Sequence, residues 1–204
     1  QEAIHAGIRA AWRCRELGYQ ILLTGEMGIG NTTTSSAVVS VLLGKDPKEV
    51  TGKGAGLSDE GLLRKQQVIR TAIQRNRPDP QDPLDVLAKV GGLDIGGLAG
   101  VFLGGATYRI PVVMDGFISA AAALVACRIE PKVSDYILPS HLSGEGGMSL
   151  VLKELGKEPF LHCGMKLGEG TGAVALMPLL DMTLEVYRHM PDFDGIQIEA
   201  YQPL

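Results

Sequence analysis

The chain has 204 residues, 45% of them hydrophobic and 21% charged, and carries a formal net charge of −4 at pH 7. This length accommodates one full hydrophobic core with at most a small appendage, and the longest uncharged apolar stretch, residues 117–127, falls short of the roughly 20 residues that span a membrane. The negative balance excludes a general attraction to nucleic acid or anionic lipid, so an anionic ligand has to be held by a local site.

The first 18 residues predict an amphipathic helix, because Ile4, Ile8, Ala11 and Trp12 recur at helical spacing. This stretch has no initiator methionine, targeting signal or N-cap signal. We therefore expect residues 1–18 to belong to an incomplete N-terminal part of a longer chain.

Residues 19–162 alternate short β-rich runs with helical runs. Strands are predicted at residues 19–24, 109–114 and 134–140. Helices are predicted at residues 32–44, 59–75, 83–90, 115–129 and 146–156, with a surface turn at 76–83. The repeated order of strand, loop and helix predicts an α/β domain with a doubly wound, mostly parallel sheet and helices on both faces. In such sheets ligands bind beyond the carboxyl ends of the strands.

The remainder of the chain, residues 163–204, has a different pattern. An apolar-periodic helix is predicted at 172–190, where Pro178 requires either a kink or a fresh start, and a polar tail without strands follows. We expect a small C-terminal helical subdomain here, which could pair with the opening helix.

The cysteines indicate where the protein resides. Cys14, Cys127 and Cys163 are odd in number, widely scattered and in no metal-ligand spacing. Such usage is typical of reduced thiols in a cytoplasmic protein.

Glycine is over-represented, with 27 residues in 204, against an average near 7%. The glycines cluster, as in GEMGIG, TGKGAG, VGGLDIGGLAG and LGEGTG. Some clusters are expected to form loops with positive φ or close backbone approach to a ligand. Tight turns and close helix packing are the alternative.

The cluster GEMGIGNTT, residues 25–33, matches a phosphate loop except that Asn31 stands where a lysine is expected. Backbone amides at a helix N-terminus suit an anion, although helix capping by the threonines is an alternative role. Because no residue replaces the lysine, the loop fits a single phosphate better than a triphosphate. Lys65 could supply one charge from elsewhere, unless it lies on a solvated helix face.

Two further polar clusters follow strands. MDGF contains Asp115 and Gly116, and HLSGEGG contains Ser143 and Gly144. We predict that the HLSGEGG and GEMGIGNTT loops lie at neighbouring strand ends and together enclose one monophosphate.

Five motifs in order, across essentially the whole chain, resemble the family of nicotinate-nucleotide dimethylbenzimidazole phosphoribosyltransferases. They are GEMGIGNTT, VTGKGAGLSDEGLLRK, PVVMDGFISAAAAL, HLSGEGG and MKLGEGTGAVALMPLL. The resemblance implies a doubly wound α/β domain, a small helical domain and a homodimer. It also implies transfer of the phosphoribosyl group of nicotinate mononucleotide to 5,6-dimethylbenzimidazole, giving nicotinate and α-ribazole 5′-phosphate for the lower ligand of cobalamin. Family members have an upstream segment that helps to form the base pocket, so this chain is expected to be the C-terminal portion and to transfer phosphoribose poorly alone.

This reaction requires neither a metal nor a cofactor, because the pyridinium leaving group departs neutral. It does require a base that accepts the proton of the attacking benzimidazole. By resemblance Glu169 is the catalytic glutamate, and stabilisation of the following helix dipole is its alternative role. Glu26 matches a second carboxylate of the family, which we assign to the ribose hydroxyls or the base edge.

The resemblance also supplies the remaining substrate-binding residues. Around the phosphate and ribose it places Gly28, Gly30, Gly54, Lys65, Gly116, Ser143 and Gly144. Asn31, Thr32 and Asp115 lie in the same motifs, and Gly168 is a further substrate-binding residue. The four histidines are expected in surface or core positions, and His141, beside SGEGG, is the one that would line the pocket.

Two other functions stay open at this point. A degenerate nucleotide hydrolase would depend on magnesium and release phosphate from a triphosphate. A non-catalytic nucleotide-binding domain would bind nicotinate mononucleotide without turnover.

Overall fold

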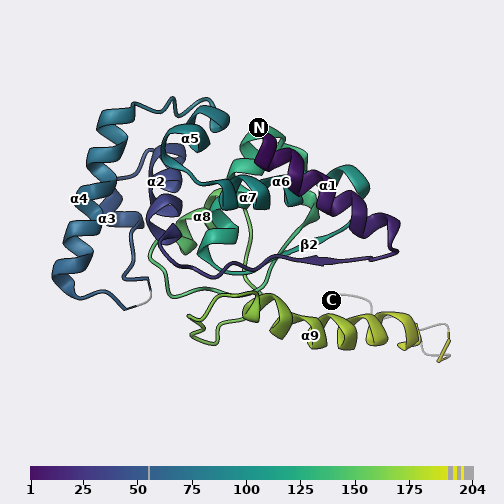
Figure 1. Cartoon of the computed structure of the whole chain (residues 1–204). Coiled ribbons are helices and arrows are strands. Elements are labelled where there is room, and N and C mark those ends of the chain that lie inside the picture. Colours follow the sequence, from purple (N-terminus) through teal and green to yellow (C-terminus); the bar gives the residue numbers. More distant parts are fainter. Residues whose placement is uncertain (55, 193–194, 197–198, 200–204) are drawn as a thin grey trace.

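A computed structural model describes residues 1–54, 56–192, 195, 196 and 199 (Figure 1). Within these residues one parallel sheet forms from β1 (Leu22–Leu23), β2 (Val112–Met114) and β3 (Ile137–Pro139), in the order β1-β2-β3. Leu22 pairs with Val112, which in turn pairs with Ile137. The predicted parallel α/β architecture is confirmed.

The described helices include every one that the sequence predicts. They are α1 (Glu2–Glu16), α2 (Asn31–Leu43), α3 (Pro47–Val50), α4 (Asp59–Asn76), α5 (Pro83–Val90), α6 (Leu93–Tyr108), α7 (Phe117–Ile129), α8 (Met148–Glu154) and α9 (Thr171–His189), with a 3₁₀ segment at Pro131–Tyr136. Side-chain caps begin α4 and α5, where Ser58 and Asp82 accept backbone N–H groups of the first turn.

Both faces of the sheet are covered. Val112 and Met114 belong to the main core, in which α7 is buried on all sides over residues 117–126. Val113 points to the opposite face and packs against Ala173 and Leu176 of α9. The alternation of side chains along β2 therefore places the main helical body on one face and the start of α9 on the other.

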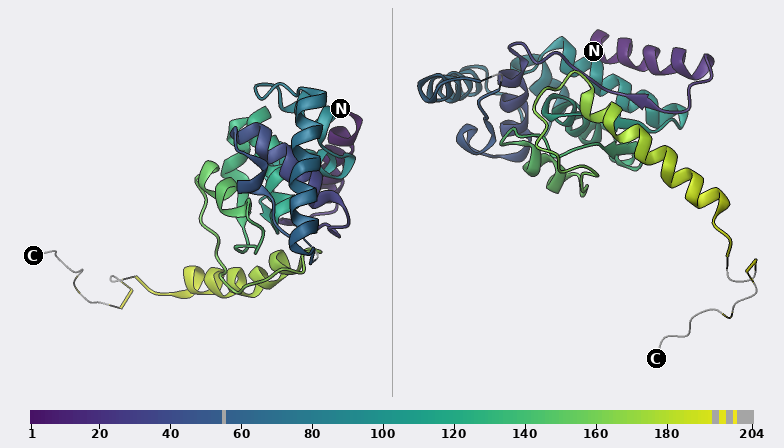
Figure 2. Two further views of the ribbon diagram at one scale, coloured as in Figure 1. Left: turned by 90° about the vertical axis from the view of Figure 1, so that its left-hand side faces the viewer. Right: turned by 90° about the horizontal axis from the view of Figure 1, so that it is seen from below.

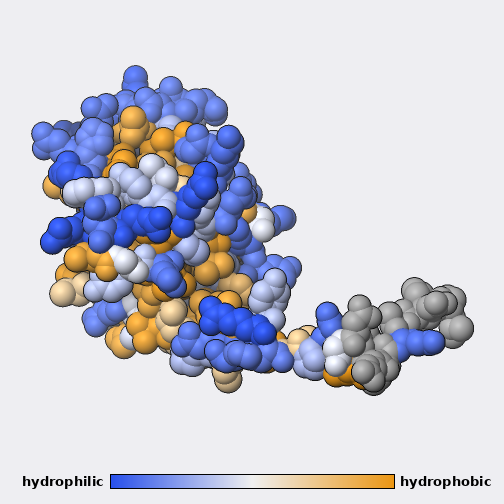
Figure 3. Space-filling view, turned by 90° about the vertical axis from the view of Figure 1, so that its right-hand side faces the viewer, coloured by the Kyte–Doolittle hydropathy of each residue, from blue (hydrophilic) through white to orange (hydrophobic). Residues whose placement is uncertain are grey.

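Helix α9 continues through Pro178 without a fresh start. Its second half extends beyond the body (Figure 2) and exposes Met182, Leu184 and Tyr187. On the face shown in Figure 3, hydrophobic residues reach the surface between hydrophilic ones. No helix among the described residues combines the length and the hydropathy needed to cross a membrane.

The glycine-rich stretch 91–108 contains a helix, α6, that the sequence analysis did not predict. α1 packs along it, on the sheet face opposite α9, so the opening helix does not pair with α9 (Figure 1). Cβ atoms added at Gly7 or Gly100 would collide with the backbone of the opposite helix. These glycines serve close helix packing, the alternative role considered for such clusters.

Replacing Gly100 with alanine is expected to lower the free energy of unfolding by about 1–3 kcal/mol, because the added Cβ would push α1 away from α6. Gly97→Ala in the same helix is the matched control, since a Cβ there would be 3.9 Å from its nearest neighbour, the Ala3 carbonyl oxygen. Urea denaturation, monitored by circular dichroism, measures the free energy of unfolding of both variants. Equal stability of the two would contradict tight α1–α6 packing.

Candidate active site

A pocket lies at the carboxyl edge of the sheet, where the loops after β1, β2 and β3 meet the loop that precedes α9. Many of the predicted substrate-binding residues line it: Glu26, Gly28, Thr32, Gly54, Asp115, Gly116, Ser143 and Gly168. Gly144 lines an adjoining pocket together with Gly54 and Ser143. The GEMGIGNTT and HLSGEGG loops therefore share one pocket, at the ends of two strands that flank β2.

The phosphate-loop segment leaves the N-terminus of α2 open. Gly30 is the N-cap residue, with φ +80°, and no side chain caps the helix. Two of the threonine side chains make other hydrogen bonds: Thr34 donates to the Asn31 carbonyl, and Thr32 accepts from Lys65. The capping alternative is thus wrong for this helix, and its first amides are available to an anion.

Lys65 reaches this helix end from α4. Its Nζ donates to Thr32 Oγ1 at 2.9 Å and to the Gly52 carbonyl at 3.1 Å, and the residue is only 8% exposed. Burial lowers the pKa of Lys65, and the nearby Glu145 carboxylate acts in the opposite direction. Lys65 therefore does not lie on a solvated helix face. It supplies a cation beside the α2 N-terminus.

Asn31 and Glu26 are both engaged within the protein. Asn31 Nδ2 donates to Asp94 Oδ2 at 2.7 Å, which ties α2 to α6, and Asn31 is not among the residues that line the pocket. Glu26 lies in the pocket wall, where its Oε2 accepts the N–H of Gly28. The loop therefore already binds one carboxylate of its own.

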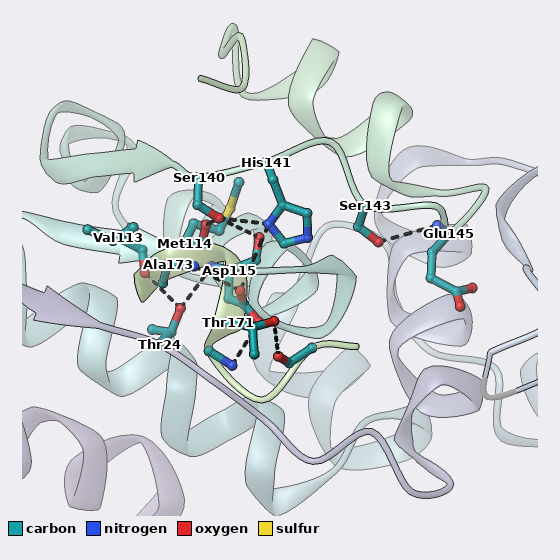
Figure 4. Close-up of polar contacts among 12 residues, drawn as sticks. Thr24, Val113, Met114, Asp115, Ser140, His141, Ser143, Glu145, Thr171 and Ala173 are labelled. Atoms are coloured by element: carbon teal, nitrogen blue, oxygen red, sulfur yellow. Dashed lines mark hydrogen bonds and ion pairs between the residues drawn. The ribbon is translucent and has the colours of Figure 1, made fainter. Parts of the chain in front are cut away.

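Asp115 is a buried anchor for the loop that carries Glu169 (Figure 4). Its Oδ2 accepts from the N–H of Gly170 and its Oδ1 from the N–H of Ala173, each at 3.1 Å. Hydrogen bonds from two amide N–H groups and the dipole of the following helix both stabilise a carboxylate in this position. Asp115 thereby fixes the first turn of α9 to the end of β2.

Glu169 sits in an unusual backbone segment. Gly168, Glu169 and Gly170 have φ of +78°, +57° and +81°, and a non-glycine residue in this region costs roughly 1–2 kcal/mol. The Glu169 N–H donates to the Glu26 carbonyl at 3.0 Å, which joins the two carboxylate-bearing loops. Glu169 itself is exposed and is not among the residues that line the pocket, whereas the two residues before it, Leu167 and Gly168, are.

The sequence analysis missed two charged residues of the pocket, Lys166 and Glu145. Both line the main pocket and the adjoining one. The aliphatic stem of Lys166 packs over Gly144, and Glu145 Oε2 is buried without a hydrogen-bond partner among the described residues. Their places inside the MKLGEGTG and SGEGG motifs were the available signal.

The chain is similar to known proteins in both sequence and fold. A sequence model of a phosphoribosyltransferase family matches residues 1–198. The chain is 51% identical over 203 residues to the nicotinate-nucleotide–dimethylbenzimidazole phosphoribosyltransferase of Ruminiclostridium cellulolyticum, covering 100% of this chain and 58% of that protein. It is 53% identical over 202 residues to the Acetivibrio thermocellus protein of the same name, covering 99% and 58%. The crystal structure of CobT from Thermus thermophilus superposes with a TM-score of 0.91 at 40% identity, covering 98% of this chain and 59% of that one. The chain thus spans about 58% of the length of the two relatives compared by sequence.

Proposed function

This chain belongs to the nicotinate-nucleotide–dimethylbenzimidazole phosphoribosyltransferase family, and on that premise we propose that it moves the 5-phosphoribosyl group of nicotinate mononucleotide to 5,6-dimethylbenzimidazole. The products are nicotinate and α-ribazole 5′-phosphate. The observation that carries the proposal is a single pocket lined both by Thr32 of the uncapped α2 N-terminus, to which buried Lys65 donates a hydrogen bond, and by Gly168 of the Glu169 loop.

The phosphate is assigned to the region between α2 and the HLSGEGG loop. The open helix N-terminus offers N–H donors and a partial positive charge, and Lys65 adds a full charge beside it. Lys166 lines the same space from the opposite loop. The phosphate site is completed by Gly28, Gly30, Gly54, Ser143 and Gly144, and Gly116 is assigned to the ribose.

The chemistry then needs one proton acceptor. One nitrogen of dimethylbenzimidazole attacks the anomeric carbon, and the bond to nicotinate breaks with its electron pair passing to the pyridine nitrogen. The proton on the other benzimidazole nitrogen passes to Glu169. Asp115 supports this assignment over the helix-dipole role, because its carboxylate already accepts the N–H groups of Gly170, the N-cap residue, and of Ala173 in the first turn of α9.

The hydrolase alternative is disfavoured by the contacts of the two side chains it needs. Asn31, in the lysine position, donates a hydrogen bond to Asp94 of α6. The Asp115 carboxylate accepts backbone N–H groups at the start of α9. Neither is free to grip a triphosphate or its magnesium ion.

We further propose a cytoplasmic homodimer, organised as residues 1–18, an α/β unit at 19–162 and a helical unit at 163–204. The separate cluster of Val113, Ala173 and Leu176 supports setting α9 apart, whereas α1 packs on α6 and joins the main core through Ala11. Analytical ultracentrifugation tests the dimer, and a concentration-independent monomer would refute it.

The function is tested by incubating the chain with both substrates and following nicotinate release by chromatography. We expect slow release that requires dimethylbenzimidazole and is unaffected by a chelator. Saturable nucleotide binding without any release would favour the non-catalytic alternative. Failure to bind nicotinate mononucleotide at all would overturn the proposal.

Lys65→Met is expected to raise the dissociation constant for nicotinate mononucleotide about 10- to 100-fold, since methionine keeps most of the buried stem and removes the charge beside the phosphate. Lys45→Met, at an exposed surface ion pair with Glu49, is the control. Calorimetric titration measures the dissociation constant of both variants for nicotinate mononucleotide. An unchanged affinity in Lys65→Met would place the phosphate elsewhere.

A further inference from the structure

His141 is a buried titratable side chain for which the reaction described above has no use. It follows β3, is 2% exposed and lines the same pocket. Its ring lies between Ser140 and Asp115 on one side and the Ser143 side of the pocket on the other (Figure 4). Such a side chain has to satisfy both of its ring nitrogens.

The hydrogen bonds around Ser140 determine which ring nitrogen carries the proton. Ser140 Oγ donates its single proton to the Met114 carbonyl at 2.8 Å, with the Asp115 carbonyl at 3.3 Å as the alternative acceptor. Ser140 Oγ must therefore accept from His141 Nδ1, which lies 2.9 Å away. The ring is the Nδ1–H tautomer, and Nε2 carries a lone pair.

No described residue donates a hydrogen bond to that lone pair, which is open to the pocket and is not among the buried unpaired atoms. Nε2 lies on the Ser143 side of the ring (Figure 4), where the wall of the pocket is formed by Gly116. A Cβ added at Gly116 would lie 3.9 Å from both His141 Cε1 and Ser143 Cβ, so the absence of a side chain here leaves space in the pocket beside the His141 ring. Burial lowers the pKa of His141, and the Asp115 carboxylate 3.9 Å from Nδ1 opposes this only in part, so the ring is a neutral acceptor.

The chemistry of the donor substrate restricts which of its groups can donate a hydrogen bond to Nε2. The phosphate and carboxylate of nicotinate mononucleotide are hydrogen-bond acceptors when ionised, whereas its ribose hydroxyls are donors. His141 also adjoins Ser143, which is assigned to the phosphate, and the ribose is joined directly to the phosphate. A ribose hydroxyl therefore fits this position in both chemistry and place.

We propose that His141 Nε2 accepts a hydrogen bond from a ribose hydroxyl of the phosphoribosyl donor, which makes the pocket selective for ribosyl over deoxyribosyl nucleotides. The inference rests on the proposed function, since it takes nicotinate mononucleotide as the ligand. Loss of the hydroxyl would remove the one substrate group that can donate to Nε2 in the pocket, and the expected discrimination is about 10- to 100-fold in affinity.

The test is calorimetric titration of the chain with nicotinate mononucleotide and with its 2′-deoxy and 3′-deoxy analogues. We expect the wild type to bind one analogue about 10- to 100-fold more weakly than the parent nucleotide. His141→Phe, which keeps a flat ring without nitrogens, should bind that analogue and the parent equally. His162→Phe, an exposed histidine, is the matched control and should discriminate as the wild type does.

A measurement on the wild type makes the test independent of how the variant folds. In ¹⁵N-labelled protein, the Nε2 resonance of His141 should shift with nicotinate mononucleotide and not with the discriminated analogue. Equal binding of all three ligands by the wild type would overturn the inference, as would a uniform loss of affinity in His141→Phe. Unchanged discrimination with reduced turnover would assign His141 to proton transfer and overturn it too. Failure of the proposed function differs, because the wild type would then either bind none of the three or bind nicotinate mononucleotide without releasing nicotinate.

Discussion

In the full-length enzyme, the Glu169→Gln variant is expected to turn over ~10²–10⁴-fold more slowly than the wild type while binding nicotinate mononucleotide with unchanged affinity. Glutamine keeps the size and much of the hydrogen bonding of glutamate and removes its capacity to accept a proton. A positioned general base contributes a rate factor of this order, corresponding to roughly 3–5 kcal/mol of barrier. Backbone strain is the same in both proteins, because glutamine at φ +57° costs as much as glutamate.

Steady-state kinetics, calorimetry and thermal denaturation together measure this result. Glu60→Gln, an exposed acidic residue in the first turn of α4, is the matched control for a helix-dipole effect. Near-normal turnover in Glu169→Gln, with a stability loss like that of the control, would exclude the catalytic role. Glu26 would then be the next carboxylate to replace.

Gly172→Ala is expected to lower the free energy of unfolding by about 3–5 kcal/mol and to reduce turnover with it. An added Cβ would collide with the His141 ring and lie 2.8 Å from Asp115 Oδ1. Overpacking of the junction would combine with the loss of charge-assisted bonds from Asp115 to the N–H groups of Gly170 and Ala173. The Glu169 loop would then lose its anchor at the end of β2.

Urea denaturation measures the stability loss, and nicotinate release measures the loss of turnover. Gly97→Ala is again the control, because α6 has room for that methyl group. Wild-type stability in Gly172→Ala would mean that the junction of β2, β3 and α9 is less closely packed than its contacts indicate.

Local patterns predicted most of the elements, and the family resemblance supplied many of the residues that line the pocket. The phosphate-loop segment and the helix after it were recognisable because glycine spacing and apolar periodicity are short-range signals. Helix α6 was missed because each interior glycine disfavours a helix by about 1 kcal/mol. The compensating contact with α1 comes from residues nearly a hundred positions away.

The role of Asp115 was hidden for the same reason. Its side chain was expected near the substrates, whereas its amide partners belong to residues 55 and 58 positions further along the chain. Lys65 was placed correctly beside the phosphate loop by resemblance, but its burial depends on the packing of α4 against α2. Spacing within a motif carries no information about such contacts.

The bond between the Glu26 carboxylate and the Gly28 N–H has a kinetic consequence. The loop carries its own competitor, so an incoming phosphate that needs this amide has to displace a tethered anion that also repels it. Apparent affinity is then reduced by the fraction of molecules in which the amide is occupied. Binding becomes a two-step event whose observed rate levels off at the rate at which the carboxylate leaves.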